Sequence, residues 1–168
     1  MDQNMVRLIE IVGDEGVLTH PESGESFSLD DKLIHPYKPS FSVKPRNADE
    51  VQKIVLWANE TCTPLVPVSS GEPHFHGDAI PTAPDVVLVD LSGMNRIMKI
   101  NRRNRLVLIE PGVTYSRLLP ELRKEGLRIA MPLLPRANKS VLTSLLEREP
   151  VISPKYQWNF LDPLRSLE

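Results

Sequence analysis

The stretch Asp85–Leu91 constrains the fold of this chain more than any other, because it is apolar at almost every position. A strand of this composition is usually buried on both faces, as in a parallel sheet. Two shorter strands are predicted before it, at residues 41–45 and 63–68, with a helix between them. Because strand, helix and strand follow one another, the sequence predicts an α/β fold that begins with a βαβ unit.

The predicted helix carries start signals at Asn47 and Glu50. The Asn47 side chain is expected to accept hydrogen bonds from first-turn N–H groups, and Glu50 to reach back to the Asn47 N–H. Five apolar residues recur at helical spacing and are expected to form its buried face: Val51, Ile54, Val55, Ala58 and Cys62. Cys62 is therefore interpreted as a small core residue rather than a nucleophile, since free cysteines are among the most buried residues.

A hairpin is predicted next, with arms at residues 97–100 and 106–109 and a turn at residues 101–105. Arg102, Arg103 and Arg105 in that turn could suggest a phosphate site. A solvated tip is the favoured interpretation, because the net charge is −2 and no aromatic residue lies among these arginines.

Two further helices are predicted after the hairpin. Thr114 is expected to cap the first, which runs to about Glu125 and stops at Gly126 in a left-handed conformation. Pro120 is expected to kink or restart this helix. The second helix is expected over residues 140–148. Its apolar side is formed by Val141, Leu142, Leu145 and Leu146.

Composition and charge exclude several classes of protein. The 20 Lys and Arg residues are balanced by 22 Asp and Glu residues, so no basic excess is available for a nucleic acid. No apolar run approaches the roughly 20 residues that span a bilayer, and the first residues do not read as a signal peptide. The single cysteine excludes a disulfide framework and a multi-cysteine zinc site. We therefore expect a cytoplasmic protein with no nucleic-acid partner and no membrane span.

The polar loop after the second strand, residues 69–77, is the candidate functional site. Its small residues leave backbone N–H groups free to form a concavity for phosphate oxygens, and Ser69 and Ser70 add hydroxyl donors. His74 and His76 could instead point to a metal, because alternate residues of an extended chain share one side. No third His or Cys stands at a spacing that completes a site, so no metal is predicted. Both histidines are interpreted as hydrogen-bonding groups near a ligand or as ordinary loop residues.

Four segments, in their order along the chain, resemble one family of flavoproteins. They are residues 39–55, 64–71, 86–97 and 108–118; the third reads Val-Val-Leu-Val-Asp-Leu-Ser-Gly-Met-Asn-Arg-Ile. The family is that of vanillyl-alcohol oxidase and p-cresol methylhydroxylase, and its glycolate oxidase and D-lactate dehydrogenase branch resembles this chain most.

The resemblance implies an FAD-binding fold of the p-cresol methylhydroxylase type (PCMH-type). This α/β fold has a small parallel-strand subdomain with flanking helices, and its second, antiparallel subdomain would be incomplete here. Residues 39–168 would form the N-terminal portion of that domain, after an N-terminal extension at residues 1–38.

The resemblance also implies which residues bind FAD. The family's pyrophosphate loop matches nine residues: Ser69, Ser70, Gly71, Glu72, Pro73, His74, Phe75, His76 and Gly77. Three residues would lie near the adenine end of FAD: Pro111, Gly112 and Val113. The segment beside the flavin ring would supply Arg136, Asn138 and Ser140.

The sequence departs from the family pattern in the loop and beside the ring. Glu72 and Pro73 replace small residues, and Ser69 stands where Arg is frequent. Because Pro73 occupies the position at which some members bind flavin through His, FAD is expected to be bound non-covalently. The segment 133–140 has no glycine, and its Arg136, Asn138 and Lys139 could donate to an anionic flavin or a phosphate.

The resemblance implies an FAD-binding portion or subunit of a flavin-dependent oxidoreductase that oxidises a small 2-hydroxy acid or alcohol. No catalytic residue is assigned, and activity is expected only if a missing half or a partner chain completes the domain. The expected partner is therefore a completing chain or another copy of this chain. Two alternatives remain open: a non-catalytic α/β partner subunit that has lost flavin binding, and an α/β ligand-binding domain unrelated to flavins.

Overall fold

The structure is a computed structural model that describes residues 3–19, 37, 39–70, 81, 83–129, 131–132 and 136–147. The chain divides into two compact units, Met1–Met94 and Asn95–Glu168, and each is described by itself. We call them unit 1 and unit 2.

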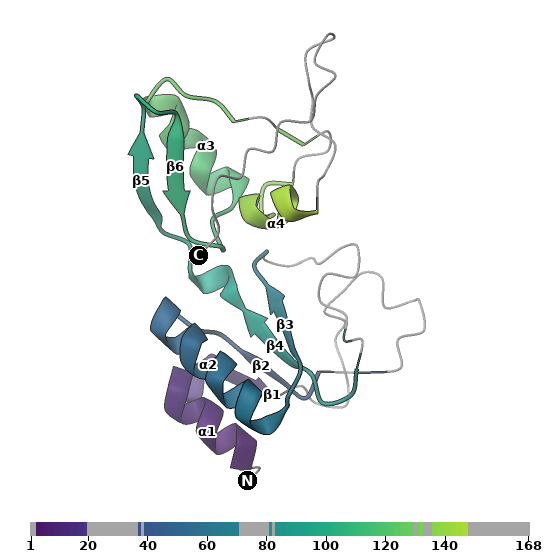
Figure 1. Cartoon of the computed structure of the whole chain (residues 1–168). Coiled ribbons are helices and arrows are strands. Elements are labelled where there is room, and N and C mark those ends of the chain that lie inside the picture. The colour runs from purple at the N-terminus through teal and green to yellow at the C-terminus, as the bar shows by residue number, and fades with distance from the viewer. Residues whose placement is uncertain are drawn as a thin grey trace. The chain divides into compact units, whose positions relative to one another are not determined.

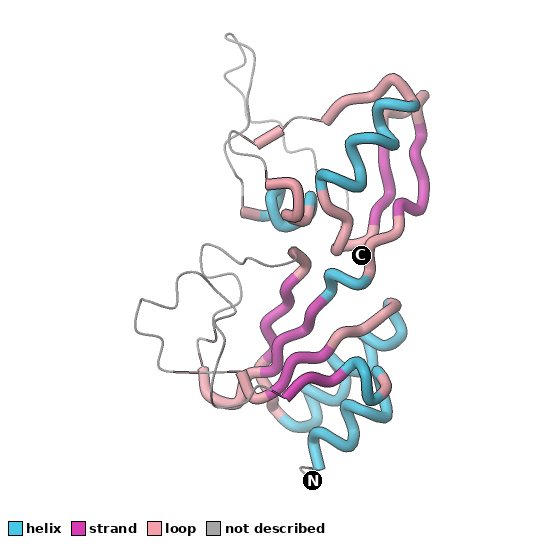
Figure 2. The backbone as a smooth tube through the Cα atoms, turned by 180° about the vertical axis from the view of Figure 1, so that it is seen from behind, coloured by secondary structure: helices cyan, strands magenta, loops and turns pink. Residues whose placement is uncertain are grey.

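Unit 1 contains a four-stranded sheet with the strand order β1-β2-β4-β3 (Figure 2). Its strands are β1 (Val17–Thr19), β2 (Phe41–Val43), β3 (Leu65–Val68) and β4 (Val87–Asp90). β2 and β3 both run parallel to β4, whereas β1 is antiparallel to β2. β4 is central and its Val87, Leu88 and Val89 are buried, as its apolar sequence predicts. The predicted α/β class and its parallel strand pair are confirmed.

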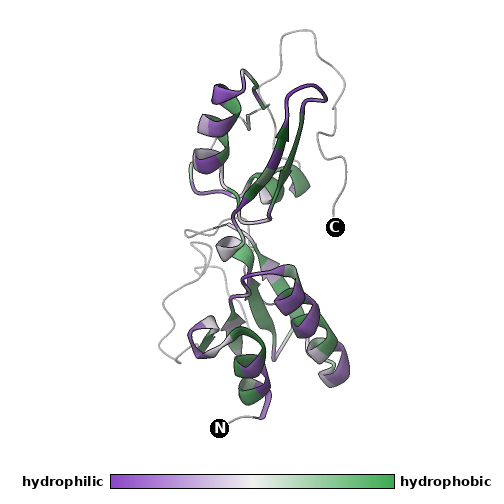
Figure 3. Cartoon of the chain, turned by 90° about the vertical axis from the view of Figure 1, so that its left-hand side faces the viewer, coloured by the Kyte–Doolittle hydropathy of each residue, from purple (hydrophilic) through white to green (hydrophobic). Residues whose placement is uncertain are grey.

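Two helices, α1 (Gln3–Val12) and α2 (Ala48–Thr61), cover one face of this sheet (Figure 1). Their apolar stripes face the sheet and their hydrophilic sides face away (Figure 3). Leu8 and Val12 of α1 join one core with Val43, Val87 and Val89 of the sheet. Part of the predicted N-terminal extension therefore contributes to the core of unit 1, and its boundary at residue 38 stays a prediction.

The predicted cap of α2 forms, with one different partner. The Asn47 side chain accepts a hydrogen bond of 3.0 Å from the Glu50 N–H. The Glu50 carboxylate accepts one of 2.8 Å from the Arg46 N–H, one residue before the expected donor. Both ends of the reciprocal arrangement thus satisfy backbone N–H groups at the start of the helix.

The buried face of α2 differs from the predicted one. Ile54, Trp57 and Ala58 are buried, whereas Val55 is 43% exposed. Cys62 is exposed, so its interpretation as a core residue was wrong. The helix ends at Thr61 and Cys62 has a φ of 54°, so helical spacing no longer sets the direction of its side chain.

Unit 2 is built on the predicted hairpin, which is confirmed. Its strands β5 (Ile97–Asn101) and β6 (Leu106–Ile109) are antiparallel, and the turn residues 102–105 are exposed. Helix α3 (Tyr115–Lys124) packs on one face of the hairpin, and α4 (Val141–Leu146) contributes Val141 to the same core.

α3 is a single helix that runs through Pro120, so the alternative of a restart is not observed. The chain leaves it at Glu125, and Gly126 has the predicted left-handed φ of 67°. Thr114 precedes the first turn as expected, but its hydroxyl lies 2.9 Å from the Ser116 hydroxyl and does not cap the helix.

α4 is shorter than predicted, and its buried side is different. Ser140 caps it, with its hydroxyl 3.3 Å from the Thr143 N–H, and the helix ends at Leu146. Val141 and Ser144 are buried, whereas Leu146 is exposed. None of the helices in the described ranges is long and apolar enough to cross a membrane.

Candidate functional site

In unit 1, Ser69 and Ser70 directly follow the carboxyl end of β3, beside the end of β4. Their exposed fractions are only 9% and 6%. Ligands of open parallel sheets bind beyond the carboxyl ends of the strands. The structure therefore places these two predicted site residues where a ligand of such a sheet is expected. The remaining predicted loop residues lie outside the described ones: Gly71, Glu72, Pro73, His74, Phe75, His76 and Gly77.

Asp90 is a charged residue at this edge that the sequence reasoning did not single out. It pairs with Val68 in the sheet register, so it lies beside the strand end that precedes Ser69. Its carboxylate accepts the Ser92 N–H at 2.9 Å and lies 3.3 Å from the Lys44 ammonium. Lys44 thus offsets a negative charge that would oppose a nearby phosphate. The sequence signal was an Asp at the end of a buried strand.

In unit 2, the structure brings four predicted site residues together. The Ser140 hydroxyl donates to the Pro111 carbonyl at 2.6 Å, across 29 residues of sequence. The Val141 N–H donates to the Val113 carbonyl at 2.9 Å. Gly112, Val113 and Ser140 are all buried. The turn at residues 111–113 and the start of α4 therefore form one local structure.

The Ser140 hydroxyl already serves this local structure. It donates its one hydrogen to Pro111 and accepts from the Thr143 N–H. It therefore has no hydrogen left for a phosphate or a flavin carbonyl. A cofactor contact at Ser140 stays a prediction that would need another atom of this residue.

The residues before Ser140 run along the start of α3. The Ala137 carbonyl accepts the Ser116 N–H at 3.1 Å, and the Lys139 carbonyl accepts the Tyr115 N–H at 3.3 Å. Asn138 is exposed and Arg136 is partly buried. Lys139 is buried and its ammonium is paired with the Glu147 carboxylate.

Arg96 and Glu110 form a pair that sequence reasoning missed. The Glu110 carboxylate accepts from the Arg96 N–H at 2.7 Å, from Nε at 2.8 Å and from Nη2 at 2.6 Å. These hydrogen bonds lower the pKa of Glu110; its burial opposes the shift, and the charges of Arg96 and Arg117 add to it. The pair fixes the chain immediately before the turn at residues 111–113. The sequence signal for this pair was a basic residue directly before the first arm of the predicted hairpin and an acidic residue directly after its second arm.

Residues 39–139 of the chain match the family described as FAD binding domain. This match covers more than half of the 168 residues. The chain belongs to the FAD binding domain family. FAD is therefore the cofactor of its family, as the sequence resemblance implies.

Individual relatives agree with this family. The 1'-carboxy-chondrochloren decarboxylase of Chondromyces crocatus is 37% identical over 89 residues, which are 53% of this chain and 16% of the relative. The flavoprotein subunit of 4-cresol dehydrogenase (hydroxylating) of Pseudomonas putida is 28% identical over 126 residues, or 72% and 24% of the two chains. The crystal structure of p-cresol methylhydroxylase with substrate bound superposes with a TM-score of 0.72 at 25% identity, over 88% of this chain and 29% of that one.

These matches confirm the expected PCMH-type fold and the family resemblance. The expected branch is also represented, by glycolate oxidase subunit GlcD of Bacillus subtilis and a D-lactate dehydrogenase of Anaerostipes hadrus. They are 28% and 27% identical over 72% and 73% of this chain. The chain spans about a quarter or less of the length of the curated relatives named here.

The described residues fit an FAD molecule by their chemistry. Ser69 and Ser70 are buried hydroxyl residues directly after the carboxyl end of β3, and hydroxyl groups can donate to phosphate oxygens. In unit 2, the turn at residues 111–113 is held by backbone and side-chain hydrogen bonds, and the exposed Asn138 has amide donors. No three His, Cys, Asp or Glu side chains gather among the described residues in a way that could hold a metal.

Proposed function

We propose that this chain is the FAD-binding portion or subunit of a flavin-dependent oxidoreductase that oxidises a small 2-hydroxy acid or alcohol. The observation that carries the proposal is the buried Ser69–Ser70 pair at the carboxyl end of β3, in a chain of the FAD binding domain family. The names of glycolate oxidase and D-lactate dehydrogenase among the relatives support a hydroxy acid as substrate.

In this proposal each predicted segment has one task. The hydroxyls of Ser69 and Ser70, with the N–H groups of residues 69–77, hold the pyrophosphate non-covalently. Residues 111–113 lie against the adenine end, and Arg136 and Asn138 donate to the flavin side of the molecule. When bound, FAD would supply the redox chemistry, which is the acceptance of a hydride from the carbon that bears the substrate hydroxyl.

We propose that a completing chain, or another copy of this chain, supplies the residues that select the substrate and accept its proton. This part is supported by a relative that is named as a flavoprotein subunit. We also propose that the assembly works in the cytoplasm, in agreement with the single cysteine of the sequence.

An absorbance spectrum of the purified protein, with and without added FAD, tests cofactor binding. Flavin bands that move to the supernatant after acid precipitation are expected, because the bond is proposed to be non-covalent. Absence of flavin bands under both conditions would contradict binding by this chain alone. Bands retained in the precipitate would contradict the non-covalent bond.

Gly71→Val tests the site within the chain, because a side chain at this position would block the approach of the backbone to the pyrophosphate. We expect it to abolish FAD binding in a titration followed by flavin fluorescence. Arg103→Ala is the control, since Arg103 is exposed in the turn of the hairpin and is not among the predicted FAD contacts. Equal losses in both variants would contradict the assignment of the loop.

A further inference from the structure

The hairpin of unit 2 has an outer face that no described residue covers. Ile97, Ile100, Val107 and Ile109 pack inward, in the core with α3. Three residues on the other side are largely exposed: Met98 by 60%, Leu106 by 44% and Leu108 by 52%. We call these three residues the open face.

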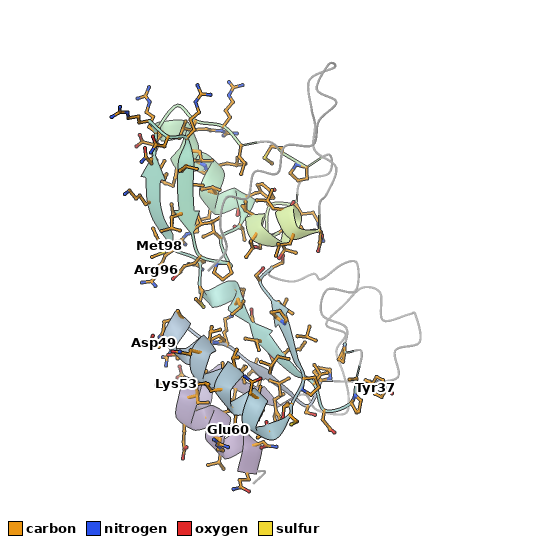
Figure 4. All side chains as sticks on the ribbon, in the orientation of Figure 1. Tyr37, Asp49, Lys53, Glu60, Arg96 and Met98 are labelled. Atoms are coloured by element: carbon orange, nitrogen blue, oxygen red, sulfur yellow. The ribbon has the colours of Figure 1, made fainter. Side chains whose placement is uncertain are left out.

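A cluster of positive charge adjoins the open face at the turn of the hairpin. Arg102 Nη2 lies 3.9 Å from the position that a Cβ on Gly126 would take, so the turn lies beside the end of α3. The turn, the last residues of α3 and the segment after it carry six exposed cations, which we call the cationic tip: Arg102, Arg103, Arg105, Arg123, Lys124 and Arg128. Figure 4 shows nitrogen-tipped side chains projecting from this end of unit 2.

The charges of the cationic tip are mostly unmatched. Glu121 and Glu125 are the acidic residues of the adjoining part of α3 and its end. Among the described residues, Lys124 alone of the six has an ion pair, of 2.6 Å to Glu121. Such a surface attracts an acidic partner over distances up to about the Debye length, roughly 10 Å at 0.1 M salt.

The chain itself contains the complementary charge. Unit 2, Asn95–Glu168, has 14 Lys and Arg residues against 7 Asp and Glu, a net charge of +7. Unit 1, Met1–Met94, has 6 against 15, a net charge of −9. The small net charge of the whole chain, −2, is therefore the sum of two large net charges of opposite sign.

We propose that the open face and the cationic tip are a docking surface for unit 1 of a second copy of this chain. An apolar centre containing Met, bordered by Arg, is typical of a protein interface. The outward residues include no aromatic side chain that would stack on a nucleic-acid base. The opposite charges of the two units provide electrostatic steering and orientation between copies.

This inference rests on the proposed need for a partner chain, but not on flavin binding. Sedimentation velocity of the purified chain, at micromolar concentration and from about 50 to 500 mM NaCl, measures the association directly. We expect dimers or larger species at low salt that dissociate as the salt concentration rises. A monomer at every salt and protein concentration would overturn the proposal, whatever the FAD titration gives.

Two single variants test the surface with equal changes of charge. Arg103→Glu places a negative charge on the cationic tip, so we expect the association constant to fall by about tenfold or more. Lys53→Glu makes the exposed side of α2 in unit 1 more acidic, so association should be unchanged or stronger (Lys53 is labelled in Figure 4). Equal weakening by both variants would show that the net charge of the chain alone controls association, and it would overturn the assignment of the surface.

Leu108→Ser tests the apolar part, because it removes an exposed side chain without changing the charge. Association should weaken while the circular dichroism spectrum is retained. If the chain stayed monomeric and bound vesicles that contain phosphatidylserine, and Leu108→Ser weakened that binding, the surface would be assigned to lipid and the proposal overturned.

Discussion

The two units hold their structures together by different means. In unit 1, two helices pack on a four-stranded sheet, and the core is apolar from α1 to β4. In unit 2, helix α3 packs on one face of a two-stranded hairpin, and polar contacts such as those of Ser140 with Pro111 and of Glu110 with Arg96 hold the turn at residues 111–113 and the start of α4. The difference indicates that burial dominates the stability of unit 1, whereas unit 2 depends more on individual hydrogen bonds and ion pairs.

The largest effect is expected in the core of unit 1. Ile54→Ala removes a fully buried side chain, so we expect the free energy of unfolding to fall by about 2–5 kcal/mol. Urea unfolding followed by Trp57 fluorescence, in a Trp158→Phe background, measures it. Val55→Ala on the exposed side of α2 is the control, and a loss as large as that of Ile54→Ala would contradict the importance of burial here.

In unit 2, Glu110→Gln removes the carboxylate that receives three hydrogen bonds from Arg96. We expect the opening free energy of β5 and β6 in hydrogen exchange to fall by about 1–3 kcal/mol at neutral pH. Glu121→Gln, at an exposed ion pair of α3, is the control and should change this opening free energy little.

The same pair predicts how unit 2 responds to pH. The folded pKa of Glu110 lies below its ordinary value of 4.5. The ionised carboxylate therefore makes its full contribution to the stability of unit 2 at any pH well above 4.5. The contribution is lost as the pH falls through the lowered folded pKa. The difference between the original protein and Glu110→Gln should therefore shrink in acid, and a constant difference from pH 7 to pH 3 would contradict the ion pair.

A smaller effect is expected at Ser140. Ser140→Ala removes the cap of α4 and the hydrogen bond to Pro111, so unit 2 should lose about 1 kcal/mol. Hydrogen exchange should accelerate in both α4 and residues 111–113. Acceleration in α4 alone would contradict the link between these segments, and Ser116→Ala, at an exposed serine, is the control.

The smallest effect is expected at the surface of unit 1. Arg7→Ala breaks an exposed ion pair of 2.7 Å to Glu60, and such pairs contribute about 0–1 kcal/mol. Trp57 fluorescence should report nearly the same unfolding midpoint. A loss comparable to that of Ile54→Ala would show that polar contacts stabilise unit 1 as strongly as they do unit 2.

The sequence predicted local features well, because each depends on residues close together in the chain. The Asn47 cap, the hairpin around residues 101–105 and the stop at Gly126 are of this kind. It failed at Cys62, where the helix had already ended, and at Leu146, since apolar character alone did not show which side of α4 is buried.

The candidate site was predictable only in part. The position of Ser69 and Ser70 followed from a strand and the polar loop after it. The hydrogen bond from Ser140 to Pro111 joins residues 29 positions apart, so no local pattern predicts it. The pair of Arg96 with Glu110 had a signal in the opposite charges that flank the predicted hairpin, but the burial of Glu110 depends on packing that the sequence does not show. The seven residues from Gly71 to Gly77 stay a prediction.

The exposed position of Cys62 has a practical consequence. It is the only cysteine of the chain and lies where α2 ends, so its thiol can carry one fluorophore or spin label without any substitution. Distances between labels on two copies would then report their separation directly. The same thiol can oxidise to a disulfide between copies, and a sample kept without reductant would then contain covalent dimers whatever the salt concentration.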